Sequence, residues 1–177
     1  MSTNNFYTDL SVITPEEVAE YAASHGHIPF ALYQEILKWI SISTVDFILT
    51  RYVDEDRLQK EFFLVYRAEA PFQGKPFVPG GRVEWGESLE VACLRQVGRE
   101  LGVSNVWPAF KGHVNVINPA SDTRPMWNST WHVFEVEVER DVEIKLNTEG
   151  TKAEWFTSID SSWSDPVRRA LELAGFL

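Results

Sequence analysis

The chain has 177 residues, of which 44% are hydrophobic, so it is long enough for one domain with a sizeable core and too short for two comfortable ones. Its formal net charge of −10 gives the long-range field the wrong sign for nonspecific attraction to a nucleic-acid backbone or to an anionic membrane. An anionic ligand must therefore be held locally, by a metal ion or by placed arginines.

The first 40 residues predict two short helices. Thr14-Pro15-Glu16-Glu17 has the order of an N-cap, a proline at the first helical position and a capping-box glutamate, which predicts a helix to about residue 24. A second amphipathic piece is expected at residues 30–40 and should pack on the domain through Leu32, Ile36, Leu37 and Ile40. We interpret residues 1–40 as an N-terminal helical extension and residues 41–177 as the main domain.

The next part of the chain predicts a hairpin, a short strand and a helix. Residues 43–53 and 61–67 are rich in β-branched and aromatic side chains and are separated by a polar stretch, which predicts a β-hairpin. FVPGGRV, at residues 77–83, is a short strand entering a glycine-rich segment. After it, apolar residues recur every four positions, which predicts a helix capped by Ser88 with a buried stripe of Leu89, Cys93, Val97 and Leu101.

The C-terminal part predicts further strands and a last helix. Residues 106–117 resemble a strand, and residues 153–157 predict a short one. In residues 131–139 apolar side chains alternate with acidic ones, which predicts a strand with one wet face that carries Glu135, Glu137 and Glu139. Asp165-Pro166 opens a helix to about residue 174. Runs of strands with helices among them favour an α/β fold with a mixed sheet between helices.

One segment combines glycines, glutamates and an arginine at a regular spacing. It reads GGRVEWGESLEVACLRQVGRELGV and spans residues 80–103. This spacing resembles the Nudix box, whose pattern is a glycine, five residues, a glutamate, seven residues, then Arg-Glu-apolar-x-Glu-Glu-x-Gly-apolar. The spacing is intact over the whole box, and two glutamates of the pattern are replaced, by Gln96 and Arg99.

The chemistry of this segment can be stated from the residues alone. Gly80 and Gly81 let the backbone turn sharply and approach a ligand closely, so that a carbonyl there can become a ligand. On a helix, positions 96, 99 and 100 share one flank and converge on one small volume. Of the three, only Glu100 is a carboxylate; Gln96 offers a neutral carbonyl oxygen, and Arg99 would repel a metal or clamp a phosphate oxygen.

The likeness extends beyond the box to one branch of the family, the GDP-mannose mannosyl hydrolases, whose box is also short of glutamates. YRAEAPFQGKPFVPGGRV, residues 66–83, is similar to that branch's segment before and into the box, and the aspartate of VDFIL, Asp46, resembles theirs. The resemblance covers residues 44–103. It implies the Nudix α/β/α sandwich and cleavage of a sugar C–O bond with one Mg²⁺, for which Mn²⁺ is an alternative.

Carried over position by position, the resemblance implies a metal site. The Gly80 carbonyl and the Glu100 carboxylate would bind Mg²⁺, and a third ligand would come from a late loop, where Glu149 stands. The branch places a histidine as general base immediately after that ligand, whereas this chain has Gly150 there. His113 and His132 are alternative bases, each in a predicted strand where a structural role is commoner.

The same carry-over implies roles for the remaining charged residues. Arg67 and Arg82 would neutralise the diphosphate, and Asp46 would orient Arg67 or the leaving group. Glu87 and Arg95 would form a structural pair that pins the loop to the helix. The residues expected to be catalytic are therefore Glu100, Arg67, Arg82 and Glu149, and those expected to bind substrate are Arg67, Arg82, Asp46 and Arg99.

Two hypotheses about function follow. The first is a magnesium-dependent hydrolase of a small-molecule nucleoside diphosphate linked to another group, with a nucleotide sugar preferred; cleavage at the pyrophosphate, with Glu149 or Glu84 as base, is a variant. The second is a catalytically weakened Nudix-fold module that binds a nucleotide or a protein without turnover. Loss of two box glutamates favours the second, whereas retention of Gly80, Arg82 and Glu100 favours the first. The branch also implies a homodimer.

The sequence also predicts a cytoplasmic protein. Cys93 is the only cysteine, so an intrachain disulfide is excluded and a reducing compartment is expected. The first residues lack the pattern of a signal peptide, and the chain has no apolar run long enough to span a bilayer.

Overall fold

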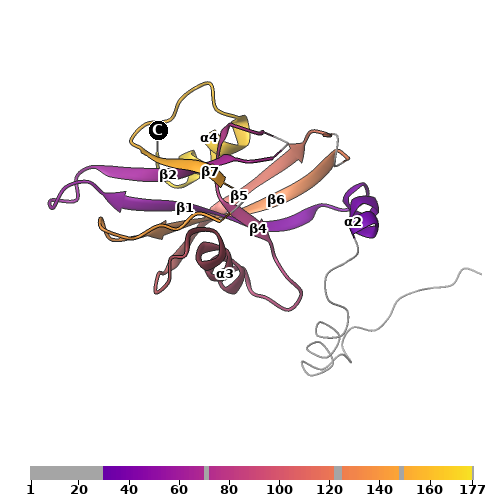
Figure 1. Ribbon diagram of the computed structural model, residues 1–177, viewed down its shortest axis with the longest axis horizontal. Coiled ribbons are helices and arrows are strands. Elements are labelled where there is room, and N and C mark those ends of the chain that lie inside the picture. The colour runs from indigo at the N-terminus through magenta and orange to yellow at the C-terminus, as the bar shows by residue number, and fades with distance from the viewer. Residues whose placement is uncertain (1–29, 70–71, 122–124, 148–149, 177) are drawn as a thin grey trace, which may run out of the picture.

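In the computed structural model, a β-sheet lies between two helices, α3 (Leu89–Leu101) and α4 (Asp165–Leu173), one on each face; a shorter helix, α2 (Phe30–Leu37), lies at one end (Figure 1). The predicted mixed sheet between helices is confirmed. The helix predicted at residues 14–24 and Glu149 lie outside the described residues. Those residues are 30–69, 72–121, 125–147 and 150–176.

The sheet has seven strands, in the order β3-β2-β1-β6-β5, with β4 paired to β1 and β7 paired to β2. Strands β1 and β6 are parallel and the other pairings are antiparallel, so the hairpin predicted from residues 43–67 is confirmed as β1 and β2. The strands are β1 (Ile42–Tyr52), β2 (Lys60–Arg67), β3 (Pro76–Phe77), β4 (Gly80–Arg82), β5 (Pro108–Asn118), β6 (Trp127–Glu137) and β7 (Gly150–Phe156).

Helix α3 begins at the predicted Ser88 cap and ends at Leu101, the last residue of the predicted apolar stripe. The Ser88 side chain accepts a hydrogen bond from the Val91 N–H at 3.3 Å, and Gly102 ends the helix at φ 65°, in the left-handed region that glycine adopts without steric cost. The apolar stripe packs against one face of the central strands, where burial of each large side chain contributes about 1.5–3 kcal/mol. This core includes Cys93, Val97 and Leu101 of α3 and Val45, Phe47 and Leu49 of β1.

The other face of the sheet corrects one prediction. Strand β6 was expected to have one wet face, but helix α4 covers that face, and Trp131 and Val133 are buried there with Val167 and Leu171 of α4. The alternation of apolar and acidic residues is real, but the period of a strand does not reveal what covers its second face. Glu135, on the covered face, is only 7% exposed.

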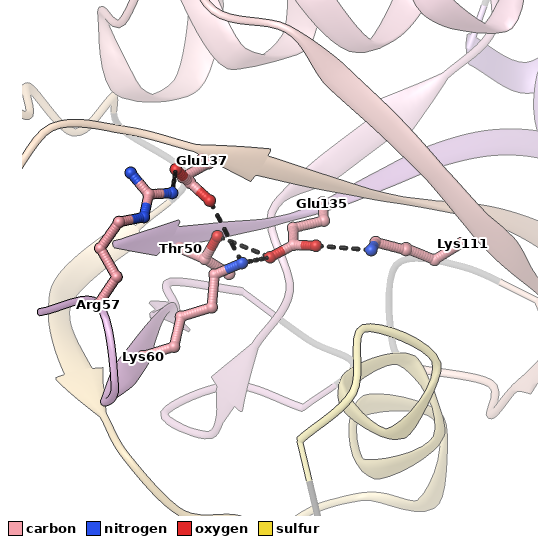
Figure 2. A network of polar contacts seen from close by, with 6 residues as sticks. All are labelled: Thr50, Arg57, Lys60, Lys111, Glu135 and Glu137. Carbon is pink, nitrogen blue, oxygen red and sulfur yellow. Dashed lines mark hydrogen bonds and ion pairs between the residues drawn. The ribbon is translucent and has the colours of Figure 1, made fainter. Parts of the chain in front are cut away.

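Charge compensation makes the burial of Glu135 tolerable (Figure 2). Its carboxylate accepts a hydrogen bond from the Thr50 hydroxyl at 2.9 Å and forms ion pairs with Lys60 and, at 2.7 Å, with Lys111. Lys60 also reaches Glu137, which pairs with Arg57 at the sheet surface. Burial alone would raise the pKa of Glu135, but the hydrogen bonds from Lys111, Lys60 and Thr50 outweigh it and hold the pKa below its ordinary value.

Helix α2 is shorter than predicted. It ends at Leu37, which is buried at 2% exposure, and the chain then turns, with the Trp39 N–H donating to the Ile36 carbonyl. Because the helical period ends there, Ile40 leaves the apolar stripe and is 54% exposed, so its predicted packing is wrong. No helix in the described ranges is long and apolar enough to cross a bilayer.

Candidate functional site

A cavity of about 570 Å³ lies beside strand β4 and is lined by residues from distant parts of the sequence. Strands β1, β2, β4 and β6 and helices α2 and α3 all contribute to its wall. Most of the residues predicted for the site meet there, namely Asp46, Arg67, Gly80, Arg82, Arg99 and Glu100. The fold therefore brings two of the three predicted metal ligands, Gly80 and Glu100, to the same place as the arginines predicted to bind phosphate.

The paired glycines of β4 are needed for a different reason from the one predicted. Neither has a positive φ, so the chain makes no glycine-specific turn here. Instead, a Cβ on Gly80 would lie 2.3 Å from the Val45 carbonyl oxygen and 2.8 Å from Oδ1 of Asp46, and one on Gly81 would lie 2.1 Å from Nε2 of Gln96. Successive strand residues point to opposite faces, so the two glycines are enclosed from both sides.

The carbonyl of Gly80 is directed away from strand β1. The Phe47 N–H donates to the Pro79 carbonyl and the Val83 N–H donates to the Ser43 carbonyl, so hydrogen-bonded pairs alternate along β1 and β4. Gly80, opposite Asp46, falls at the intervening position, where main-chain groups point off the pair. Among the described strands none pairs with the other edge of β4, so this oxygen is positioned to act as a ligand.

Glu87 and Arg95 connect the loop after β4 to helix α3. Arg95 donates to both carboxylate oxygens of Glu87, at 2.6 and 2.7 Å, and to the main-chain carbonyl of Arg82 at 2.9 Å. The hydrogen bonds from Arg95 hold the pKa of Glu87 below its ordinary value. The contact has the geometry expected of a structural pair.

The flank of helix α3 presents two buried polar side chains to the cavity. Glu100 is 7% exposed and Gln96 is 2% exposed, whereas Arg99 is exposed at the cavity rim. Oε1 of Gln96 is buried with no hydrogen-bond partner among the described residues. An oxygen in that state is available to accept from a ligand or to coordinate a cation.

The loop before β7 lies against the same end of α3. The Asn147 N–H donates to the main-chain carbonyl of Glu100 at 3.1 Å, and the Lys145 N–H donates to that of Leu101. Asn147 and Gly150 both line the cavity. They flank Glu149, whose predicted role as a metal ligand stays a prediction because it lies outside the described residues.

The oxygen atoms that could bind a metal at this cavity fit one hard cation better than several. The residues that the structure describes contain no group of three histidine, cysteine, aspartate or glutamate side chains that could hold a metal. They do offer the Glu100 carboxylate, the Gly80 carbonyl and the unpartnered Gln96 oxygen around one cavity. Mg²⁺ binds through one or two carboxylates together with substrate phosphates and waters, so this set is sufficient for a single ion.

Asp46 is buried in the cavity wall and differs from an ordinary carboxylate. Burial raises its pKa to about 8, although the hydrogen bond from the Thr44 hydroxyl, at 2.6 Å, and the charge of Arg67 both act to lower it. At neutral pH the group is therefore largely protonated and can donate a hydrogen bond to a ligand oxygen. Sequence reasoning found Asp46 through the resemblance but could not predict its protonation state.

Two arginines of the cavity are backed by aromatic rings. The guanidinium carbon of Arg67 lies 4.8 Å from the centre of the Phe77 ring, and that of Arg82 lies 4.5 Å from the centre of the Tyr33 ring. Tyr33 belongs to helix α2, before the box and its surroundings, and sequence reasoning did not select it. Only its place beside Arg82 in three dimensions identifies it.

The two histidines predicted as alternative bases lie outside the cavity, whereas two tryptophans line it. His113 on β5 and His132 on β6 meet edge to face, with ring centres 5.4 Å apart, and do not line the cavity. Trp127 and Trp131 do line it, as do the buried Asn118 and Ser129, which sequence reasoning missed. Asn118 donates to the Ser129 hydroxyl at 3.0 Å. Trp85 and Trp107 are outside the cavity lining, with exposures of 57% and 87%.

Comparison with known proteins identifies the class of protein to which this fold and site belong. The NUDIX domain family model matches residues 46–170, and the chain belongs to this family. A search of curated proteins found no match. The family assignment agrees with the intact spacing of the box and with the sheet between two helices.

Solved structures agree with the family assignment. The NUDIX domain of Shewanella oneidensis NrtR complexed with ADP ribose is 21% identical, with a TM-score of 0.61 over 92% of this chain and 97% of that chain. A MutT protein from Methanosarcina mazei is 24% identical, with a TM-score of 0.57 over 75% and 91%. A MutT NUDIX hydrolase from Burkholderia pseudomallei is 22% identical, with a TM-score of 0.58 over 76% and 98%. These likenesses support the fold and do not single out the GDP-mannose mannosyl hydrolase branch.

Proposed function

We propose that the chain is a magnesium-dependent hydrolase of a nucleoside diphosphate linked to another group, with a nucleotide sugar as the preferred substrate. The observation that carries this proposal is the meeting of Gly80, Glu100, Arg67 and Arg82 around one cavity. Membership of the Nudix family supports a hydrolase. The complex of the NrtR NUDIX domain with ADP ribose supports a ligand in which a diphosphate joins a nucleoside to a sugar.

Within this proposal the metal is held by few protein groups. The Glu100 carboxylate and the Gly80 carbonyl would be its ligands, with Glu149 as a third and the Gln96 oxygen as a neutral alternative. A bound Mg²⁺ would supply positive charge that polarises the diphosphate and stabilises the departing anion. Mn²⁺ is an alternative because it accepts the same oxygen ligands.

The arginines of the cavity would hold the diphosphate. The chain carries a net charge of −10, so a diphosphate gains nothing from the long-range field and needs local cations. Arg67 and Arg82 line the cavity and Arg99 lies at its rim, each with a planar set of donors that matches phosphate oxygens. Their charge would offset the negative charge that accumulates on the leaving group. Asp46, protonated at neutral pH, would donate a hydrogen bond to a substrate oxygen.

Activation of water needs a general base, for which Glu84 and Glu149 are the candidates. Glu84 lines the cavity, its side chain is half-exposed, and its carboxylate lies 3.4 Å from the Arg95 guanidinium, so water can reach it. Glu149 is the other candidate, because Asn147 and Gly150, which precede and follow it in the sequence, line the cavity. Each would act by accepting a proton from the attacking water.

A substrate panel tests the proposal. Purified protein is incubated with GDP-mannose, UDP-glucose, ADP-ribose and dinucleoside polyphosphates, with and without Mg²⁺, and release of sugar, nucleotide and phosphate is measured. We expect metal-dependent hydrolysis that Glu100→Gln lowers at least about 100-fold, since loss of even an outer-shell group costs 10–100-fold. Glu90→Gln, an exposed change on the same helix, is the matched control and should be neutral. Equal hydrolysis by wild type and Glu100→Gln would overturn the metal assignment.

A second candidate function is a Nudix-fold module that binds a nucleotide or a protein without turnover. The observation that favours it is the chemistry of the helix flank, where Gln96 and Arg99 occupy the positions of two box glutamates. Tight binding of a panel member in calorimetry, together with no release of any product, would support the module. The site residues Arg67 and Arg82 would then serve binding alone.

A further inference from the structure

We propose that Tyr33, on helix α2, is a positioning residue that holds the guanidinium of Arg82 ready for a diphosphate. This inference rests on the proposed function, because it assumes that Arg82 binds a diphosphate. Tyr33 lines the cavity, and the centre of its ring lies 4.5 Å from the guanidinium carbon of Arg82. It precedes residues 46–170, the part of the chain that the family model matches, so the assignment adds a residue from outside the shared domain.

The type of contact suits a group that must bind an anion. A guanidinium over an aromatic ring is attracted through the face of the ring, and this leaves the in-plane N–H donors available for phosphate oxygens. Among the described residues no carboxylate forms an ion pair with Arg82, so none of them neutralises its charge. The ring thus orients the side chain without competing with a diphosphate for its donors.

Orientation matters because Arg82 is a long side chain on a three-residue strand. Ordering such a side chain costs conformational entropy, and a side chain already ordered before binding loses less when the ligand arrives. The main chain of Arg82 is held as well, because Arg95, itself bound to Glu87, donates to its carbonyl at 2.9 Å. The box pair therefore fixes the backbone of Arg82, and Tyr33 fixes its charged end.

The other arginine of the cavity is built in the same way. Arg67 has its guanidinium carbon 4.8 Å from the centre of the Phe77 ring, and both residues line the cavity. Phe77 lies in β3, within the matched domain, whereas Tyr33 comes from the extension. Two arginines backed by rings on one cavity indicate a common design for presenting cations to an anionic ligand.

The experiment compares Tyr33→Leu with Tyr33→Phe, which keeps the ring. Binding of inorganic pyrophosphate with Mg²⁺ is measured by calorimetry, and KM and kcat are measured on any panel substrate that is turned over. We expect Tyr33→Leu to weaken pyrophosphate binding about two- to tenfold and to raise KM with little change in kcat, and Tyr33→Phe to stay within about twofold. Tyr52→Leu is the matched control, since the Tyr52 ring lies 4.2 Å from the guanidinium carbon of Arg57 and outside the cavity.

A double-mutant cycle with Arg82→Gln shows whether Tyr33 acts through Arg82. If it does, Tyr33→Leu has no further effect on pyrophosphate binding in the Arg82→Gln background. An equal loss in both backgrounds, or wild-type binding by Tyr33→Leu, overturns the inference, as does a wild-type protein that binds no diphosphate. If nucleotide sugars are not hydrolysed but Tyr33→Leu still weakens pyrophosphate binding and the cycle shows coupling, the proposed function fails and the role of Tyr33 stands.

Discussion

Two polar side chains are buried on opposite faces of the sheet, and they differ in whether their oxygens have hydrogen-bond partners. Glu135, on the α4 face, is fully partnered by Thr50, Lys60 and Lys111. Gln96, on the α3 face, has a buried oxygen with no hydrogen-bond partner in the described part of the chain, and it lines the cavity. An unsatisfied buried acceptor costs about 1–3 kcal/mol, so a fold keeps one only with a compensating use. We infer that the Glu135 network stabilises the domain. We infer also that the part of the cavity wall around Gln96 and Gly81, the Gln96 corner, binds a ligand.

The largest expected effect in this comparison is the loss of the Glu135 carboxylate. Glu135→Gln leaves two lysines beside a neutral amide, and we expect the free energy of unfolding to fall by about 2–4 kcal/mol with turnover per folded molecule unchanged. Urea denaturation measures the change. Glu137→Gln is the control, because the Glu137 side chain is 41% exposed and its removal should cost less than about 1 kcal/mol. Similar losses of unfolding free energy in the two variants would show that burial does not increase the contribution of Glu135 to stability.

The pH dependence of stability sharpens the same point. Because the pKa of Glu135 is held below its ordinary value, the folded protein binds fewer protons at this group than the unfolded chain does. Its stabilisation is present above the unfolded pKa, 4.5, and is lost as the pH falls through the folded pKa. The difference between wild type and Glu135→Gln should therefore shrink below that pH. Urea midpoints measured from neutral pH to about 3 test this, and a difference that stays constant would contradict it.

Gly81→Ala tests how tightly the Gln96 corner is packed. The added Cβ would meet Nε2 of Gln96 at 2.1 Å, so we expect a loss of about 1–3 kcal/mol in stability and a displaced Gln96. Gly98→Ala, on the same helix as Gln96, is the matched control. Its Cβ would meet no atom nearer than 3.7 Å, and the substitution should add about 0.5–1 kcal/mol through helix propensity. Thermal unfolding of the two variants should move in opposite directions; a shift in the same direction would contradict the packing argument.

Gln96→Leu has the smallest expected effect on stability and separates the two regions most directly. It removes the unpartnered oxygen, so the free energy of unfolding should stay level or rise by about 1 kcal/mol, while ligand-dependent stabilisation by Mg²⁺ with pyrophosphate should weaken. Gln96→Glu, which restores the glutamate of the box, should strengthen that stabilisation. Thermal shift with and without Mg²⁺ and pyrophosphate measures both. A destabilised Gln96→Leu protein with an unchanged response to the ligand would contradict our inference that the Gln96 oxygen contributes to ligand binding and not to stability.

Local patterns predicted the elements well because their causes are local. The Ser88 cap, the four-residue apolar period and the glycine after Leu101 are sufficient to define α3, and the β1–β2 hairpin follows from two β-rich runs with a polar turn. The box spacing likewise predicted which residues share a helix flank. The failures had two causes. Helix α2 ends before Ile40, so the predicted helical period did not extend that far. The strand period of β6 was right, but it did not show that α4 covers the second face of the strand.

By itself, the sequence determined the family, the mixed α/β architecture and the residues of the box, because helix caps, strand periods and motif spacing depend on neighbours along the chain. Only the tertiary structure decided the protonation state of Asp46, the enclosure of Gly80 and Gly81, and the place of Tyr33 beside Arg82. These depend on burial and on contacts between residues far apart in the chain. No local pattern encodes them, since the same side chain is ionised in water and protonated in an apolar wall.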